Sequence, residues 1–301
     1  MSQNYKKLLN ISDLNRDDIN YILDTSEQLI NEQDPLLLNK SIGLIFEKYS
    51  TRTRLSFQVG ISQLGGNPIN IKFEDLNLQR MESFDDTFAI LSLYLDCIVF
   101  RTTSHIKLIK AYESFQKPLI NGLSDLSHPC QIISDLYTLK MHFKKFEGLT
   151  ISWFGDMNNV LFSYFELMSL FPEISLNVFT DLDVYNNKFS SFPKSDNINF
   201  FFEIDEKIIK KSDCIMTDVY NSMNDNEKLD IHNKEIKLKK FQVNENLMNL
   251  SNDKCVFMHC LPANKGIEVT EGVINSPKSI LLKQAKNRLI AQKGILKWLD
   301  I

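Results

Sequence analysis

Short apolar runs alternate with amphipathic segments along most of the chain. Such runs are typical of strands buried in a parallel sheet, and apolar positions spaced three and four apart are typical of helices. Strands are expected over 42–46, 67–71, 97–100, 117–122, 149–154, 175–180, 213–217, 255–258 and 279–282. Helices are expected over 8–33, 55–64, 83–95, 129–139, 160–170 and 285–299. This order predicts an α/β fold of two doubly wound parallel-sheet domains that face each other across a cleft.

Residues 50–54, with the sequence Ser-Thr-Arg-Thr-Arg, follow the first expected strand. Ser50 or Thr51 is expected to cap the next helix. The first-turn N–H groups and the positive end of the helix dipole then point at one place, which Arg52 and Arg54 flank. Because the helix is too apolar for a surface position, we expect this corner to face the interior. The pattern favours a phosphate site over a solvated basic turn that only caps a helix.

Two further polar groups lie at predicted element ends in the first half. Arg101 ends the strand at 97–100, and ligands of open α/β sheets gather outside the carboxyl ends of strands. His128 precedes Pro129, which fits the first position of a helix, and Gln131 lies in its first turn. The positive end of that helix would lower the pKa of the imidazole and favour the neutral ring. A surface arginine and a structural cap are the alternative interpretations.

Polar residues also follow strands of the second half. Asn159 ends the turn at 155–159, and Asp218 and Cys260 each follow a predicted strand. The turn is similar to a dinucleotide-binding turn, but the pattern Gly-x-Gly-x-x-Gly is absent, so no NAD site is predicted. His259 beside Cys260 invites the interpretation of a Cys–His dyad. Adjacent residues of an extended chain point to opposite faces, which argues against that dyad.

Composition narrows the classes of function. Of the 301 residues, 43% are apolar and 24% are charged, and 38 acidic against 34 basic residues give a net charge of −4, which provides no overall field for nucleic acid. Since no run approaches the roughly 18 apolar residues of a membrane span, and the start lacks a signal-peptide core, we expect a cytoplasmic protein. The five cysteines show no paired framework or metal-binding spacing, so reduced thiols and no structural metal are expected.

Five motifs occur together in an order that is typical of one family. With them the chain resembles the aspartate/ornithine carbamoyltransferase family nearly from end to end. Ser-Thr-Arg-Thr-Arg (50–54) and His-Pro-Cys-Gln (128–131) resemble the family's signatures for carbamoyl phosphate. Gly-Asp-x-Asn-Asn (155–159), Asp-x-x-x-Ser-Met (218–223) and His-Cys-Leu-Pro (259–262) resemble those of members that use ornithine.

The resemblance implies an enzyme of arginine metabolism. It would transfer the carbamoyl group of carbamoyl phosphate to the δ-amine of L-ornithine, giving L-citrulline and phosphate. A metal or organic cofactor is not needed, because the departing phosphate can take the proton of the amine. The family also implies a homotrimer or a multiple of one, without a nucleic-acid or membrane partner. The expected domains are a carbamoyl-phosphate-binding domain at 1–130, on which the helix at 285–301 packs, and an ornithine-binding domain at 131–284.

Individual roles follow from the same resemblance. Catalysis is expected to depend on Arg101, His128 and Cys260. The expected carbamoyl-phosphate-binding residues are Ser50, Thr51, Arg52, Thr53, Arg101, His128, Pro129, Cys130, Gln131, Cys260, Leu261 and Arg288. The expected ornithine-binding residues are Asn159, Asp218, Ser222 and Met223. The family also implies a cis peptide bond between Leu261 and Pro262.

Three positions depart from the family pattern, and three alternative functions stay open. Asn224 replaces a glycine, Asn77 stands where a glutamine often reaches a neighbouring subunit, and Tyr49 replaces Pro or Arg. The acceptor could be putrescine or an acylated ornithine, although the Ser222-Met223 pair and Cys260 argue against this. The chain could also be a binding protein that retains only the carbamoyl-phosphate corner. A nucleotide-binding oxidoreductase is the third alternative, and it lacks the glycine fingerprint.

Overall fold

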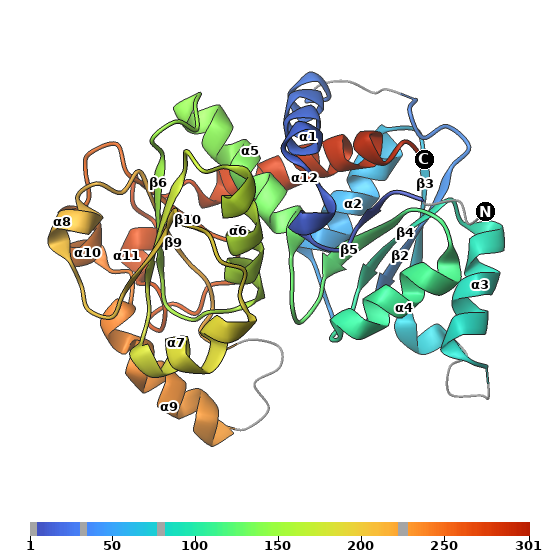
Figure 1. Cartoon of the computed structure of the whole chain (residues 1–301). Coiled ribbons are helices and arrows are strands. Elements are labelled where there is room, and N and C mark those ends of the chain that lie inside the picture. The colour runs from blue at the N-terminus through green and yellow to red at the C-terminus, as the bar shows by residue number, and fades with distance from the viewer. Residues whose placement is uncertain (1–4, 31–34, 77–81, 222–227) are drawn as a thin grey trace. The chain divides into compact units, whose positions relative to one another are not determined.

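Two parallel five-stranded sheets, one in each of two compact units, form the fold (Figure 1). The computed structural model describes residues 5–30, 35–76, 82–221 and 228–301. The first unit comprises Met1–Tyr137 with Lys286–Ile301, and the second comprises Thr138–Ala285. Helices flank both sheets, which confirms the predicted α/β class. The division between the units lies within α5 (Pro129–Phe143), the helix at whose start the sequence placed the boundary.

The first sheet has the strand order β1-β5-β4-β2-β3. Its strands are β1 (Lys7–Leu8), β2 (Ser41–Phe46), β3 (Asn67–Lys72), β4 (Cys97–Arg101) and β5 (Leu119–Leu123). Its helices are α1 (Arg16–Gln28), α2 (Arg52–Gln63), α3 (Phe84–Tyr94), α4 (His105–Phe115), α5 and most of α12 (Leu281–Leu299). The chain leaves β2 toward β3 on one side and resumes at β4 on the other. The order of strands therefore reverses between β2 and β4, where this class of sheet binds its ligands.

The core of the first unit fixes the position of β4. Phe100 of β4 packs against Phe88 of α3, with ring centroids 5.5 Å apart, and Leu108 and Phe115 of α4 join the same fully buried cluster. Burying each of these side chains contributes about 1.5–3 kcal/mol. The strand that ends in Arg101 is therefore held firmly from one face.

Helix α12 returns to the first unit and packs on α1. A side chain at Gly294 would collide with the hydroxyl of Ser26 and the carbonyl of Ile22, so that only glycine permits this close approach. Trp298 Nε1 donates to Asp18 Oδ1 at 2.8 Å, and Lys293 Nζ donates to the carbonyl of Leu29 at 3.1 Å. These contacts fix the helix that carries Arg288.

The second sheet has the order β10-β9-β6-β7-β8. Its strands are β6 (Thr150–Phe154), β7 (Ser175–Phe179), β8 (Ile198–Phe201), β9 (Cys214–Thr217) and β10 (Val256–His259). Its helices are α6 (Asn159–Leu170), α7 (Leu182–Lys188), α8 (Glu206–Ile209), α9 (Lys228–Leu238), α10 (Glu245–Leu250) and α11 (Glu271–Ile274). Phe154, Phe179 and Phe201 stack across β6, β7 and β8, with centroids 4.5 and 4.9 Å apart. The order of strands reverses between β6 and β9.

Three expectations about elements are wrong. The first helix begins at Arg16, after an Asn15–Asp18 capping box, and residues 7–8 instead pair with β5. The segment at 181–200, for which no helix or strand is predicted, contains α7 and the start of β8, which pairs with β7. In place of the strand expected at 279–282 there is an isolated bridge between Ser279 and Phe257.

Candidate active site

The first cluster of polar residues lies at the reversal between β2 and β4. Arg101, the last residue of β4, stands opposite Phe46, the last residue of β2. The N–H of Glu47 donates to the carbonyl of Arg101 at 3.0 Å, and Arg101 Nη1 donates to Ser50 Oγ at 3.4 Å. The structure thus brings Arg101 and Ser50 together, as the sequence predicted.

The start of α2 differs from the expectation in two respects. Thr51 occupies the cap position, but its side chain accepts no hydrogen bond from the first turn, so its hydroxyl does not occupy the N–H groups there. Arg54 is exposed, whereas Arg52 is half-buried and Thr53 is buried. Leu55 and Val59 of α2 are also exposed, because the helix has more apolar residues than its buried face holds.

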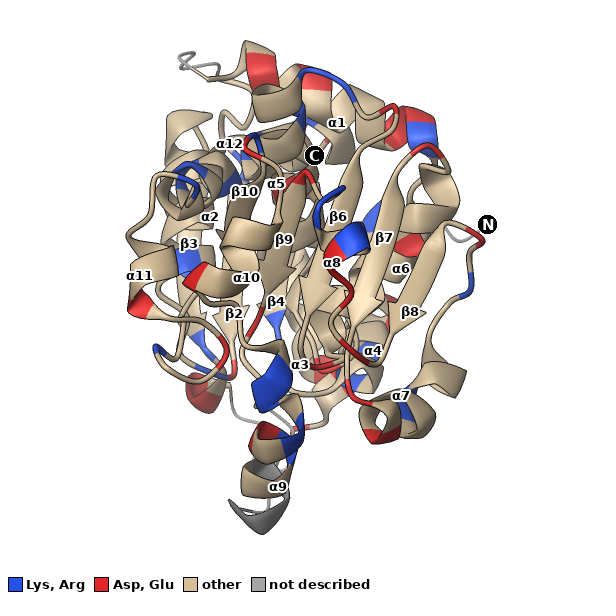
Figure 2. Ribbon diagram, turned by 90° about the vertical axis from the view of Figure 1, so that its left-hand side faces the viewer, with Lys and Arg blue, Asp and Glu red and all other residues tan. Residues whose placement is uncertain are grey.

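His128 is buried immediately before α5, and three arginines act on it. Burial lowers the pKa of its imidazole well below the ordinary value, and the guanidinium groups of Arg288, Arg101 and Arg52 lower it further. The direction of this shift agrees with the prediction, and its causes are burial first and these arginines after it. Basic and acidic residues are interspersed over the ribbon (Figure 2), so this concentration of positive charge is local. An anion fits such a place.

Gln131 in the first turn of α5 is completely buried. Its Nε2 donates to Asp135 Oδ1 at 2.7 Å, and its Oε1 accepts from Arg288 Nη2. Pro129 is the first residue of α5, as predicted. The thiol of Cys130 donates to a backbone carbonyl of β5 at 3.4 Å, and burial raises its pKa to about 12. The sequence analysis did not identify Asp135, although a Gln–Asp pair four residues apart on a helix is a recognisable signal.

Glu47 is a second residue that the sequence analysis did not identify. Its Oε2 accepts from the Thr102 hydroxyl and the Thr103 N–H, both at 2.8 Å, and its Oε1 pairs with Lys107 Nζ at 2.9 Å. Burial alone would raise the pKa of this carboxyl, but the Thr103 N–H, Lys107 and the Thr102 hydroxyl together hold it below its ordinary value. Glu47 therefore fixes the loop that follows Arg101.

Replacing Glu47 by Gln is expected to lower the free energy of unfolding by about 1–3 kcal/mol at pH 7, because the ion pair and one acceptor are lost. The folded-state pKa of Glu47 is depressed, so its contribution is complete above the unfolded-state pKa and disappears as pH falls through the folded-state value. Urea unfolding at pH 7 and at pH 3 measures this. Glu203→Gln is the control, since Glu203 is exposed and pairs with Lys240 at the surface. An equal effect of both substitutions at pH 7 would contradict the role of Glu47.

The second cluster lies at the reversal between β6 and β9. Asn158 caps α6, accepting from the Val160 and Leu161 N–H groups at 3.1 Å, and its Nδ2 donates to Asp218 Oδ2 at 2.7 Å. The thiol of Cys260 donates to Asp218 Oδ1 at 2.8 Å. Two of the predicted residues, Asp218 and Cys260, are therefore in direct contact, and Asn158 joins them.

The turn at β10 is held by a buried histidine. His259 Nδ1 accepts from the N–H of Leu261 at 2.9 Å, so that its Nε2 carries the proton toward Glu268 Oε1 at 3.3 Å. Cys260 pairs with Asp218 rather than with this ring, which agrees with the argument against a dyad. The bond between Leu261 and Pro262 is cis, as expected. Glu268 could not be identified from the sequence, because its contact with His259 forms only when the loop between the two residues folds back.

A buried ion pair supports the turn before α6. The Asp156 carboxylate binds Lys188 Nζ at 2.9 Å and Lys234 Nζ at 2.6 Å, and the Asp156 carbonyl accepts from Trp153 Nε1. Gly155 has a φ of 116°, and the ring of Tyr220 lies where its Cβ would be. The backbone next to Asn158 is therefore fixed by packing and by charge.

Of the other residues named in the sequence analysis, some are described and some lie outside the described ranges. Asn159 is the first residue of α6 and is half-buried. Ser222, Met223, Asn224 and Asn77 lie outside the described residues. Tyr49 is fully exposed.

Within the described ranges, one group of side chains has metal-ligand chemistry. The ligand atoms of Asp218, His259 and Cys260 lie within 4.8 Å of one another. Each of the three already has a hydrogen-bond partner in the protein, so a metal ion would have to replace these bonds.

Family models match nearly the whole chain. Residues 6–141 match the carbamoyl-P binding domain of aspartate/ornithine carbamoyltransferases, and residues 147–299 match the Asp/Orn binding domain. The chain is 40% identical over 305 residues to ornithine carbamoyltransferase of Bradyrhizobium diazoefficiens, a match that covers 99% of this chain and 98% of that protein.

Solved structures agree with the sequence relatives. Ornithine carbamoyltransferase from Thermus thermophilus superposes with a TM-score of 0.87 at 30% identity, covering 99% of both chains. The anabolic ornithine carbamoyltransferase from Campylobacter jejuni superposes with a TM-score of 0.86 at 27% identity, covering 98% of this chain and 99% of that one.

Proposed function

Because this chain belongs to the aspartate/ornithine carbamoyltransferase family, we propose that it transfers the carbamoyl group of carbamoyl phosphate to the δ-amine of L-ornithine. The products are L-citrulline and phosphate, so the reaction belongs to arginine metabolism. One observation carries the proposal most directly: each sheet places a polar cluster at its own strand reversal, one rich in arginine and one built on a buried carboxylate. The first suits an acyl phosphate, and the second suits a cationic amino acid.

Carbamoyl phosphate is assigned to the first cluster. Its phosphate binds at the turn of residues 50–53, where Arg52 and Arg101 neutralise its charge and first-turn N–H groups donate to it. Its carbonyl and amino groups are assigned to Thr53, His128, Gln131 and Arg288. Thr53 and His128 are buried, so their hydrogen bonds are not weakened by water.

L-Ornithine is assigned to the second cluster. Asp218 offers a buried carboxylate for its ammonium group, and Asn159, Ser222 and Met223 are assigned to its α-amino and α-carboxylate groups. Cys260, through its hydrogen bond to Asp218, orients the δ-amine. The buried carboxylate of Asp218 favours a cationic substrate over a neutral one.

The chemistry joins the two ligands in one substitution. The neutral δ-amine attacks the carbamoyl carbon, a C–N bond forms, and negative charge develops on the carbonyl oxygen. Arg101, the Thr53 hydroxyl and the neutral ring of His128 donate to that oxygen, which is the kind of interaction that contributes most to catalysis. The bond from carbon to the phosphate oxygen then breaks, and the phosphate leaves with the amine's proton.

Purified protein with saturating carbamoyl phosphate is expected to convert L-ornithine to citrulline, and to use putrescine or N-acetylornithine at least about a hundredfold less efficiently. The reason is that the polar groups assigned to the α-amino and α-carboxylate groups would lose hydrogen-bond partners with the other acceptors. Colorimetric detection of ureido products across the three acceptors measures this. An absence of citrulline would disprove the proposed function, and a preference for another acceptor would reassign the second substrate.

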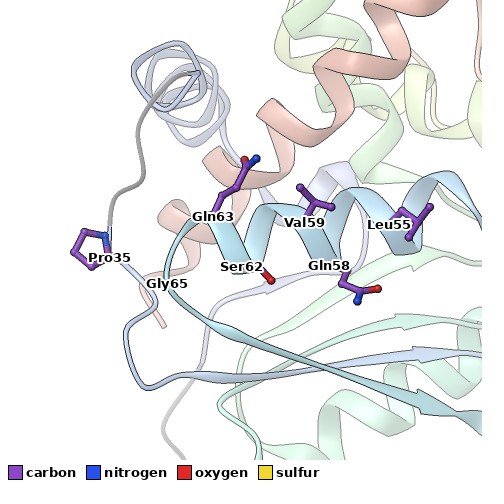
Figure 3. Close-up of a pocket in the computed structure, with 7 residues that line it drawn as sticks. All are labelled: Pro35, Leu55, Gln58, Val59, Ser62, Gln63 and Gly65. Carbon is purple, nitrogen blue, oxygen red and sulfur yellow. The ribbon is translucent and has the colours of Figure 1, made fainter.

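We also propose a homotrimer, or a multiple of one. The exposed side of α2 carries Leu55 and Val59, 45% and 41% exposed, which line an open hollow of about 530 Å³ together with Gln58, Pro35 and Gly65 (Figure 3). A second copy of this chain would bury these apolar side chains. Light scattering is expected to give the mass of three chains or a multiple of three, and a monomeric mass would contradict the proposal.

The expected location is the cytoplasm. All five cysteines are free thiols, four of them buried, which fits a reducing compartment. Among the described helices, none has the length and apolar character that crossing a membrane requires.

A further inference from the structure

The side-chain amide of Gln131 is held from both of its ends. Asp135 Oδ1 accepts from Gln131 Nε2 at 2.7 Å, and Arg288 Nη2 donates to Gln131 Oε1. Gln131 and Asp135 are completely buried, and Arg288 is 5% exposed. The pair four residues apart is part of α5, whereas Arg288 comes from α12.

The chemistry of these two partners permits only one orientation of the amide. An ionised carboxylate only accepts hydrogen bonds, and a guanidinium group only donates them. Turning the amide by 180° would place its oxygen against the Asp135 carboxylate and its NH₂ group against Arg288. Both contacts would then be repulsive in a buried place, where such repulsion is poorly screened. Asp135 and Arg288 therefore fix Gln131 with its oxygen on the side of Arg288.

That oxygen has two lone pairs, and Arg288 occupies one of them. The other can accept one hydrogen bond from a ligand at the arginine-rich cluster. In carbamoyl phosphate the group beside the carbonyl is an NH₂ donor. Acetyl phosphate has nearly the same shape and charge, but it carries a methyl group there, which cannot donate. An amide fixed in this way thus distinguishes the two by a hydrogen bond rather than by size.

We propose that Asp135 is a specificity-determining residue, which selects a carbamoyl group over other acyl groups by fixing the orientation of Gln131. The inference rests on the proposed function, because it takes carbamoyl phosphate as the ligand of the first cluster. Asp135 acts through Gln131 and is a positioning residue. A buried carboxylate is costly, and an apolar residue would serve helix packing alone at lower cost. The selection of one acyl group explains why the carboxylate is retained.

The test compares the KM for carbamoyl phosphate with the inhibition constant of acetyl phosphate, which competes for the same cluster, using the full chain and saturating L-ornithine. In Asp135→Leu only Arg288 still orients the amide, and Gln131 Nε2 loses its buried partner. The KM for carbamoyl phosphate is expected to rise roughly tenfold to a hundredfold, the effect of one buried unpaired group. The inhibition constant of acetyl phosphate is expected to stay within about twofold, since its methyl group makes no hydrogen bond to Gln131.

Two further variants keep the test decisive. Asp135→Asn retains an acceptor for Gln131 Nε2, so its ratio of inhibition constant to KM is expected to lie between those of the parent and Asp135→Leu. Gln131→Glu places a second carboxylate against that of Asp135, so that the two repel each other. Adding Asp135→Asn replaces one of them by an amide, whose NH₂ group can donate to the carboxylate at position 131. The ratio of inhibition constant to KM is therefore expected to be at least about threefold higher in the double variant than in Gln131→Glu alone. Ser134→Ala, the neighbouring buried position on α5, is the control and should leave the ratio unchanged.

The outcomes separate this inference from the function. If the parent protein forms no citrulline, the proposed function fails. If it forms citrulline but KM and the inhibition constant rise together, Asp135 only maintains the structure, and the inference is overturned. An unchanged ratio in Asp135→Leu overturns it as well. If Asp135→Leu does not fold, the double variant decides, and a failure to recover the ratio overturns the inference.

Discussion

Replacing Arg101 by alanine is expected to reduce kcat/KM for carbamoyl phosphate by at least about 10²–10³, or about 2.7–4 kcal/mol of transition-state stabilisation. Arg101 ends β4 at the reversal of the first sheet, where it contacts Ser50 and contributes to the positive potential at His128. In the proposed reaction it neutralises the phosphate and donates to the developing oxyanion. Both interactions strengthen as the transition state forms, so kcat as well as KM should change.

Two variants sharpen this test. Arg101→Lys keeps the charge but not the planar pair of donors, so it is expected to recover only a small part of the lost activity. Arg16→Ala is the control, since Arg16 is an exposed arginine of α1 in the same unit. Steady-state citrulline formation measures all three proteins. A value of kcat/KM for Arg101→Ala within about tenfold of the parent would show that Arg101 is not an oxyanion donor.

The sequence pattern was sufficient to predict four of the five strands of each sheet and the polar residues at their ends. Apolar runs identify buried strands, and polar residues directly after them mark the edge where ligands of such sheets bind, so Arg101, Asp218 and Cys260 could be found. The pattern failed where packing between distant segments decides the structure. Residues 7–8 form a strand because β5 offers them a partner, and Phe200 belongs to a strand because it pairs with Val178 of β7.

The same distinction applies to the site. Local rules predicted that Pro129 begins a helix and that the pKa of His128 is lowered. They could not identify the dominant causes of that shift, which are burial and arginines from three separate elements. Glu268 and Glu47 were not recognisable, because their partners come together only in the folded chain. Asp135 is different, since its spacing from Gln131 was visible in the sequence but carried no functional meaning until Arg288 was placed.

Replacing Asp218 by asparagine is expected to reduce kcat/KM for L-ornithine by about 2–5 kcal/mol, the range measured when one partner of a buried charge pair is removed. Asp218 is 6% exposed, and each carboxylate oxygen accepts one hydrogen bond, from Asn158 at 2.7 Å and from Cys260 at 2.8 Å. An asparagine would turn an NH₂ group toward one of these two donors. The negative charge that attracts the ammonium group of the substrate would also be lost.

This role is identified by comparing the effect of the substitution on the kinetic constants for L-ornithine with its effect on those for carbamoyl phosphate. The KM for carbamoyl phosphate, whose assigned residues belong to the other cluster, is expected to change by less than about threefold, a difference well below the buried-pair effect. Asp183→Asn is the control, because Asp183 is an exposed carboxylate of the same unit that pairs with Lys237. An equal rise of both KM values would indicate that Asp218 maintains the structure of the second unit. An unchanged kcat/KM for L-ornithine would show that the buried carboxylate does not bind the amino acid, and the acceptor site would have to be sought elsewhere.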